Sequence, residues 1–268
     1  MLGQYGYLEN FINELRSNGK YTFSLPDVRK QFEQSDKAIK MALQRLKKKK
    51  EIALIRNEFY VVVTPEYRSK GTIPPSLFIA DLMKFLEKDY YIGLLNAAAY
   101  YGAAHQQPQS FSVITTKPSV SNIDNDNLTI NFYIKKGWDK DDIVQKKVDT
   151  GYINVSTAEL TALDLVNYFD QAGGLTRVTT VLEELCESID ADKMLELVKR
   201  YSPITAVQRL GFLLEEILSM RNLSDPIKGY LKTVRYFPVL LRPQKEKPVM
   251  ITGNDWKVVQ NVEIETEV

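Results

Sequence analysis

Apolar side chains recur at the spacing of a helix in three segments near the N-terminus. In the segment over residues 7–16, these positions are Leu8, Phe11, Ile12 and Leu15. A short second helix is expected from the capping residue Ser24 to Phe32, with Pro26 in its first turn. In a third helix, which follows residues 34–36, the apolar positions are Ile39, Ala42, Leu43 and Leu46. The pattern therefore predicts three helices within the first 50 residues.

Two β-rich runs follow the predicted helices. They cover residues 51–55 and 59–63, and residues 56–58 between them form a loop short enough for a hairpin. Three helices followed by a hairpin are the order of a winged helix-turn-helix. We therefore predict that fold for residues 1–70.

A second domain is expected beyond a linker. Residues 64–75 combine three prolines and one glycine with basic residues, which is typical of a domain boundary. Beyond it the pattern predicts helices over 76–88 and 90–103, then strands over 110–116, 128–135 and 147–155. Residues 157–234 are mainly helical in pattern, with breaks at 173–174, 188–190, Pro203 and Pro226, and β-like runs cover 236–241 and 256–264. Residues 76–268 are therefore predicted to form an α+β domain.

Composition and charge fit a two-domain globular protein. The 268 residues are 44% hydrophobic and 26% charged, and their formal net charge is only +1. Residues 1–70 hold 14 Lys and Arg against 8 Asp and Glu, whereas the remainder holds 21 against 26. A basic N-terminal part on a mildly acidic body is the charge distribution expected of a protein whose first domain meets phosphate.

The cellular compartment is predicted from what the sequence lacks. Cys186 is the only cysteine, which excludes an intramolecular disulfide and fits a reducing compartment. The first 15 residues lack the basic lead and apolar run of a signal peptide, and the weakly polar stretch 90–104 is too short to span a bilayer. We therefore expect a cytoplasmic protein.

The outward face of the third helix suits a recognition helix for DNA. Opposite its apolar positions lie Lys37, Lys40, Met41, Gln44 and Lys48. Lysines attract phosphates, and Gln44 can bond to a base edge in the major groove. Ser35 is placed to meet a phosphate at the helix start, and Arg56 and Asn57 lie at the hairpin tip, where a wing commonly enters the minor groove. Alternatively, Lys47 to Lys50 only solvate the helix end and complement its dipole.

No catalytic residue, metal site or cofactor is predicted. His105 lies in a polar turn without a serine or cysteine nucleophile motif beside it. Asp139, Asp141 and Asp142 lack the spacing of a calcium loop and are expected in a solvated loop, and Gly173-Gly174 follows a helix rather than a strand. Cys186 falls on an apolar helix face and is interpreted as core.

An internal helix is predicted from an apolar segment near the C-terminal part of the chain. Residues 206–215 are apolar enough to lie inside the body, and Gly211 within them permits close approach of a neighbour.

Several stretches of the second domain resemble the AbiEi family of antitoxins. They are residues 90–99 running into 102–109, 150–152 leading to 156–165, 172–175, 208–211 and 254–259. The resemblance implies an autorepressor that binds inverted-repeat operator DNA. It also implies that the C-terminal domain supports repression and counteracts a nucleotidyltransferase-like toxin encoded by the neighbouring gene. At residues 56–60 the sequence departs from the family, which tends to have an arginine-glycine turn there.

Two other functions fit the same N-terminal domain. One is a DNA-tethered enzyme that processes nucleic acid, and clustered carboxylates with a metal would favour it. The other is a ligand-sensing repressor, which an apolar pocket with convergent polar groups would favour. Neither signal is clear in the sequence, which also leaves the oligomeric state open.

Overall fold

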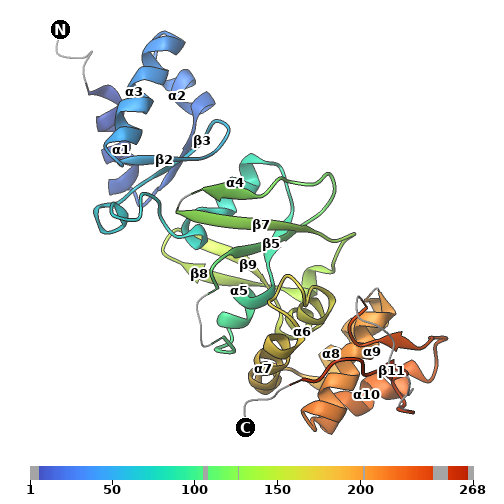
Figure 1. Cartoon of the computed structure of the whole chain (residues 1–268). Coiled ribbons are helices and arrows are strands. Elements are labelled where there is room, and N and C mark those ends of the chain that lie inside the picture. Colours follow the sequence, from blue (N-terminus) through green and yellow to red (C-terminus); the bar gives the residue numbers. More distant parts are fainter. Residues whose placement is uncertain (1–5, 105–107, 126, 202, 244–252, 265–268) are drawn as a thin grey trace. The chain divides into compact units, whose positions relative to one another are not determined.

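The computed structural model describes residues 6–104, 108–125, 127–201, 203–243 and 253–264. The chain divides into two compact units that interleave in sequence (Figure 1). The first holds residues 1–91, 109–137 and 145–154, and the second holds 92–108, 138–144 and 155–268. This division does not follow the linker, so the two domains expected over 1–70 and 76–268 stay a prediction.

The first unit begins with three helices and a small sheet, which we call the head (residues 7–63). Its elements are α1 (Tyr7–Ser17), β1 (Thr22–Ser24), α2 (Leu25–Gln31), α3 (Asp36–Lys48), β2 (Ile52–Arg56) and β3 (Phe59–Val62). The three strands are antiparallel in the order β1-β3-β2. The expected helices and hairpin are confirmed, and the order of elements is that of a winged helix-turn-helix.

Local capping and apolar spacing explain why the head folds this way. Ser24 and Asp27 form a capping box at the start of α2, and the Ser35 side chain accepts a hydrogen bond from the amide of Ala38 in α3. The core of the head is one cluster, drawn from all three helices and the sheet: Leu8, Phe11, Ile12, Phe23, Leu25, Val28, Ile39, Ala42, Leu43, Leu46, Ile52 and Val62. The head thus contains its own core.

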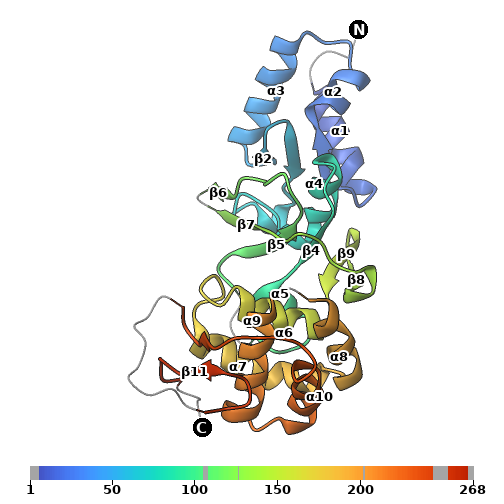
Figure 2. The ribbon, with the colours of Figure 1, turned by 90° about the vertical axis from the view of Figure 1, so that its right-hand side faces the viewer.

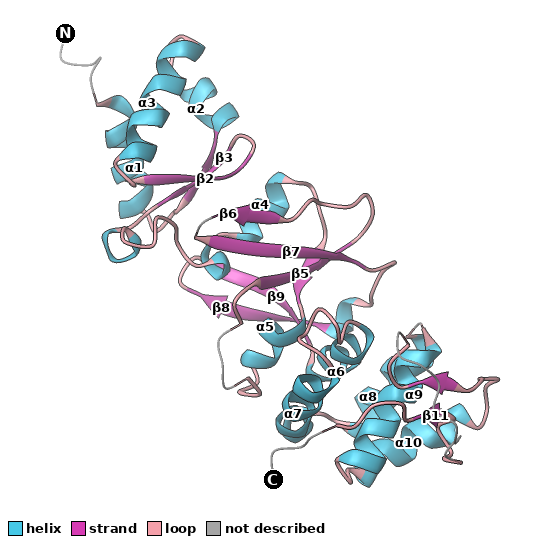
Figure 3. Cartoon of the chain, viewed as in Figure 1, coloured by secondary structure: helices cyan, strands magenta, loops and turns pink. Residues whose placement is uncertain are grey.

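A six-stranded sheet follows the head, in the order β6-β7-β5-β4-β9-β8. Its strands are β4 (Tyr90–Ile92), β5 (Phe111–Thr115), β6 (Ile123–Asn125), β7 (Leu128–Ile134), β8 (Ile143–Val148) and β9 (Gly151–Ser156). The pairs β5–β7 and β4–β9 are parallel, and β6–β7 is antiparallel. Ahead of β4, the short helices η1 (Pro65–Tyr67) and η2 (Pro75–Leu77) lead to α4 (Ile79–Phe85). Mixed pairing and separate helices make this an α+β protein (Figure 3).

Two sequence predictions in this sheet were wrong. The helix expected over 90–103 begins as strand β4 and continues as the short α5 (Leu94–Ala99), because Tyr91 and Ile92 are fully buried within the sheet. A short apolar run fits either structure, and pairing with β9 decides between them. The strand expected over 147–155 is two neighbouring strands, β8 and β9, joined by a turn at 149–150.

The second unit is mainly helical (Figure 2). Its larger helices are α6 (Ala158–Asn167), α7 (Leu175–Leu185), α8 (Ala191–Arg200), α9 (Ile204–Phe212) and α10 (Arg221–Leu231). A π-helical turn over Leu213–Ile217 follows α9, and short 3₁₀ turns cover Lys140–Asp142 and Cys186–Ser188. The β-like runs near the C-terminus contain two-residue parallel strands, β10 (Val239–Leu240) and β11 (Val258–Val259).

The expected break at Pro226 was also wrong, since this proline lies inside α10. Proline removes one amide donor, and the carbonyl four residues earlier loses its partner. That carbonyl belongs to the exposed Asn222, where water can replace the donor. Burial of Leu223, Ile227 and Leu231 on the other face holds the helix together. The breaks expected at 173–174, 188–190 and Pro203 are confirmed.

The prediction of a close approach at Gly211 is confirmed. The fully buried indole of Trp256 packs against Gly211 in α9, so closely that a methyl group there would overlap the ring. The buried Gln208 donates hydrogen bonds to the carbonyl oxygens of Phe237 (2.9 Å) and Trp256 (2.8 Å). α9 thereby fixes two segments of the C-terminal part of the chain.

Candidate nucleic-acid interface

The two faces of α3 separate cleanly. Ile39, Ala42, Leu43 and Leu46 are buried, as the helical spacing predicts. The five residues expected on the outward face are all exposed: Lys37, Lys40, Met41, Gln44 and Lys48. Met41 is 55% exposed, which is unusual for a large apolar side chain. Arg45 and Lys47 are exposed beside this face as well, although the helical spacing alone did not assign them to it. Seven residues of one helix therefore form a basic surface, which also contains the side-chain amide of Gln44 and the thioether of Met41.

Ser35 lies at the start of this surface. Its side chain accepts a hydrogen bond from the amide of Ala38 at 3.3 Å, so it caps α3. The capping contact uses the hydroxyl as an acceptor and leaves its proton available for a phosphate oxygen. The cap and a phosphate contact are therefore compatible.

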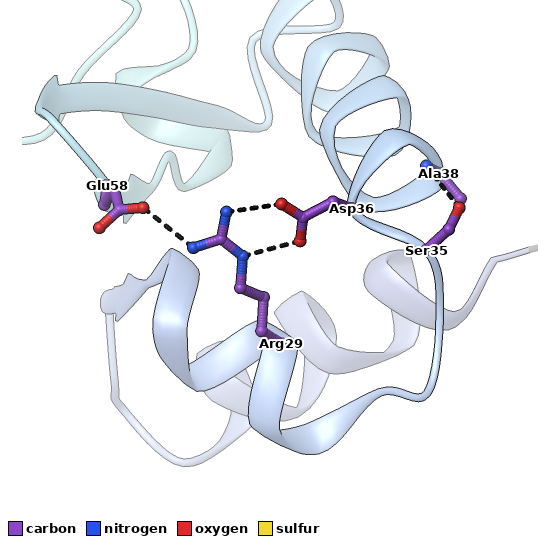
Figure 4. Close-up of polar contacts among 5 residues, drawn as sticks. All are labelled: Arg29, Ser35, Asp36, Ala38 and Glu58. Atoms are coloured by element: carbon purple, nitrogen blue, oxygen red, sulfur yellow. Dashed lines mark hydrogen bonds and ion pairs between the residues drawn. The ribbon is translucent and has the colours of Figure 1, made fainter.

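Arg29 of α2 connects the start of α3 to the wing (Figure 4). Its Nε and Nη2 donate to the two carboxylate oxygens of Asp36 at 2.8 and 2.9 Å, and its Nη1 donates to Glu58 at 3.1 Å. The Arg29 hydrogen bond lowers the pKa of Asp36, and Lys40 acts in the same direction. Sequence analysis missed Arg29, because its partners lie 7 and 29 residues away.

The wing is the turn between β2 and β3. Asn57 is exposed at its tip, and Glu58 follows with a positive φ of 62°. Arg56 is half-buried, and its guanidinium donates to the carbonyl oxygen and the hydroxyl of Ser121, both at 2.8 Å. Both residues belong to the first unit. Arg56 thus has protein partners in this structure, whereas Asn57 is open to a ligand.

The polar groups of the second unit hold helices together. The expectation of a solvated loop over 139–142 was wrong for Asp142, which is 6% exposed and paired with Arg200 of α8. Burial raises the pKa of this carboxyl, although Arg200 acts in the opposite direction. Tyr201 donates a buried hydrogen bond to Asp164 at 2.6 Å, and Glu159 accepts one from the amide of Asp190 at 2.9 Å.

Of the two reactive residues singled out in the sequence, Cys186 and His105, the structure describes Cys186. Cys186 is buried as predicted, and burial raises the pKa of its thiol to about 12, which disfavours the nucleophilic thiolate. His105 lies outside the described residues. Within the described ranges, no group of three or more histidine, cysteine or acidic side chains is arranged to hold a metal ion. In the same ranges, no helix combines the length and apolarity needed to cross a membrane.

Comparisons with known proteins place the chain. Residues 91–216 match the family model of the AbiEi antitoxin C-terminal domain. The fold is similar to that of the RV2827C protein from Mycobacterium tuberculosis, with a TM-score of 0.67 at 11% sequence identity, over 95% of this chain and 91% of that one. Among curated proteins, no sequence matches. At this sequence identity, the structural similarity is evidence for the fold alone.

Proposed function

Because residues 91–216 match the family model of the AbiEi antitoxin C-terminal domain, we propose that the protein is a DNA-binding antitoxin and autorepressor. The head binds inverted-repeat operator DNA upstream of its own gene. The C-terminal domain, residues 76–268, counteracts a nucleotidyltransferase-like toxin encoded by the neighbouring gene. The protein acts in the cytoplasm and without catalysis, as a regulator rather than an enzyme.

The observation that carries the DNA-binding part is the exposed basic face of α3. Lys37, Lys40 and Lys48 contact phosphates, and Gln44 reads a base edge in the major groove. Ser35 donates to a phosphate at the helix start, and Met41 makes apolar contact beside Gln44. Asn57 and Arg56 of the wing contact the neighbouring groove, for which Arg56 must leave Ser121. Each of these roles follows from exposure and chemistry in the place where a winged helix meets DNA.

Binding of the full chain to a labelled duplex from upstream of its gene, followed by fluorescence anisotropy, tests this proposal. We expect tighter binding to this duplex than to a scrambled one. Lys37→Ala with Lys40→Ala should weaken binding to both duplexes. The slope of log affinity against log salt should fall by about 1.8, because each lost phosphate contact removes about 0.9.

The matched control removes two exposed lysines of the second unit, one in α8 and one directly after α10: Lys193→Ala with Lys232→Ala. This variant should bind as wild type does. In cells that express the neighbouring toxin, the Lys37/Lys40 variant should rescue growth, because residues 91–216 are unchanged in it. Equal affinity of the Lys37/Lys40 variant and wild type for the upstream duplex would refute the recognition-helix assignment.

A further inference from the structure

Two carboxylates lie within the surface that is proposed to face DNA. Asp36 is the first residue of α3, directly before Lys37, and its side chain is 58% exposed. Glu58 lies in the wing turn directly after Asn57 and is 35% exposed. A carboxylate near a phosphate is repelled by it, and water and salt only partly screen the repulsion between two charges in close proximity. An unpaired Asp36 and Glu58 would therefore oppose the attraction of the neighbouring lysines.

Both carboxylates share one guanidinium. Arg29 reaches Asp36 through two parallel hydrogen bonds and Glu58 through a third, all between 2.8 and 3.1 Å (Figure 4). The bidentate arrangement is the strong form of this pairing, because the planar fork of arginine matches the two oxygens. Three of the five N–H donors of Arg29 are committed to these carboxylates. The side chain itself remains 36% exposed.

We infer that Arg29 is a charge-masking residue for DNA binding. Its positive charge pairs with both Asp36 and Glu58 and offsets one of their two negative charges, so that they repel phosphate less. This inference rests on the proposed function and adds a residue that lies outside the recognition helix. A solvent-exposed ion pair contributes little to folding, because water screens it and both side chains lose conformational freedom. Its effect is therefore expected in DNA affinity rather than in stability.

Masking differs from direct phosphate contact by Arg29 in what restores binding. If Arg29 masks, its loss is harmful only while the two carboxylates are present. If Arg29 itself contacts phosphate, removing the carboxylates cannot replace the lost contact, and the salt slope falls by about 0.9. The combination of substitutions therefore separates the two roles.

The test measures affinity for the upstream duplex with full-length variants. Arg29→Gln should weaken binding about tenfold, because it makes the surface more negative by one charge and leaves both carboxylates without their cationic partner. Arg29→Gln with Asp36→Asn and Glu58→Gln should restore the affinity at least to that of wild type, because both negative charges are removed together with the positive one. The charge control is Arg29→Gln with Glu9→Gln and Glu14→Gln, which removes the same number of charges but takes the carboxylates from α1. It should stay as weak as Arg29→Gln alone.

Wild-type binding in the same assay tells the two hypotheses apart, since failure of wild type to prefer the upstream duplex contradicts the proposed function itself. When wild type binds, the masking role is overturned by an unchanged Arg29→Gln affinity, by a triple variant that stays weak, or by equal recovery in the α1 control. Circular dichroism confirms folding of each variant. If Arg29→Gln does not fold, Asp36→Asn with Glu58→Gln in the presence of Arg29 takes its place. That variant should bind at least as tightly as wild type, and weaker binding would overturn the inference.

Discussion

At the scale of single residues, the packing of Gly211 against Trp256 shows what a missing side chain permits. Any Cβ at position 211 would overlap the buried indole ring. We expect Gly211→Ala to lower the free energy of unfolding by about 1–3 kcal/mol through overpacking. Trp256→Leu alone should cost about 3 kcal/mol through the cavity it leaves. Chemical denaturation of both single variants and of the double variant measures their coupling.

The double variant separates overpacking from an intrinsic effect of the helix. If overlap with the indole is the cause, Gly211→Ala should cost far less once Trp256 is leucine, so the two effects are not additive. Additive costs would contradict this account. Gly229→Ala in α10 is a matched control, because a Cβ there meets open space and glycine already costs helix stability.

Glu215 provides a second prediction at this scale. It accepts hydrogen bonds from Lys228 and from the indole nitrogen of Trp256, and its side chain is 14% exposed. Burial acts to raise the pKa of Glu215, but the two hydrogen bonds outweigh it and lower the pKa below its ordinary value of 4.5. Ionised Glu215 therefore contributes to the free energy of unfolding in full above pH 4.5, and this contribution is lost as the pH falls through the lowered pKa.

The comparison with Glu215→Gln tests this linkage. At neutral pH the substitution should lower the free energy of unfolding by about 2 kcal/mol, because it weakens two hydrogen bonds to a charged group. The difference between wild type and variant should shrink as the pH drops below 4.5. A difference that is constant with pH would show that the charge on Glu215 does not stabilise the fold. Glu216→Gln on the same turn serves as the control.

At the scale of the element, the outward face of α3 combines general and specific contacts. Lysines attract any phosphate backbone, whereas the amide of Gln44 is the group that distinguishes bases. We expect Gln44→Ala to reduce the preference for the upstream duplex over a scrambled one by about 1–3 kcal/mol. Its salt dependence should stay as in wild type. Competition between the two duplexes measures the preference, and Lys193→Ala in the second unit should leave it unchanged.

At the scale of the whole molecule, the head carries its own core, and yet it also contacts other parts of the first unit. Thr22 donates to Asp81 at 2.6 Å, Arg56 pairs with Ser121, and Phe59 packs on Phe85. A fragment of residues 1–70 keeps the core cluster of the head and loses these three contacts. We expect it to fold with reduced stability and to bind DNA weakly, with strong dependence on salt.

The complementary fragment tests the division of labour. Residues 76–268 contain the whole region that matches the antitoxin domain. Their length exceeds the size at which a core becomes marginal, so we expect them to fold alone. This fragment should rescue growth when the neighbouring toxin is induced, without specific binding to the upstream duplex. Rescue by residues 1–70 alone would contradict the assignment.

The sequence by itself determined the head, because its structure depends on local signals. Spacing of apolar residues, the caps at Ser24 and Ser35 and the short hairpin loop each act over a few residues, and all agree. The same spacing determined which side chains of α3 point outward. It also identified Cys186 as core and Gly211 as a point of close approach.

Only the tertiary structure decided the features that depend on partners distant in the chain. Residues 90–92 became a strand because β9 pairs with them, and Asp142 became buried because Arg200 neutralises it 58 residues later. Arg29 meets Asp36 and Glu58, and Arg56 meets Ser121, through folding of separate segments. Propensity and spacing describe the chain within about one helical turn, whereas ion pairs and sheet neighbours are set by the path of the whole chain.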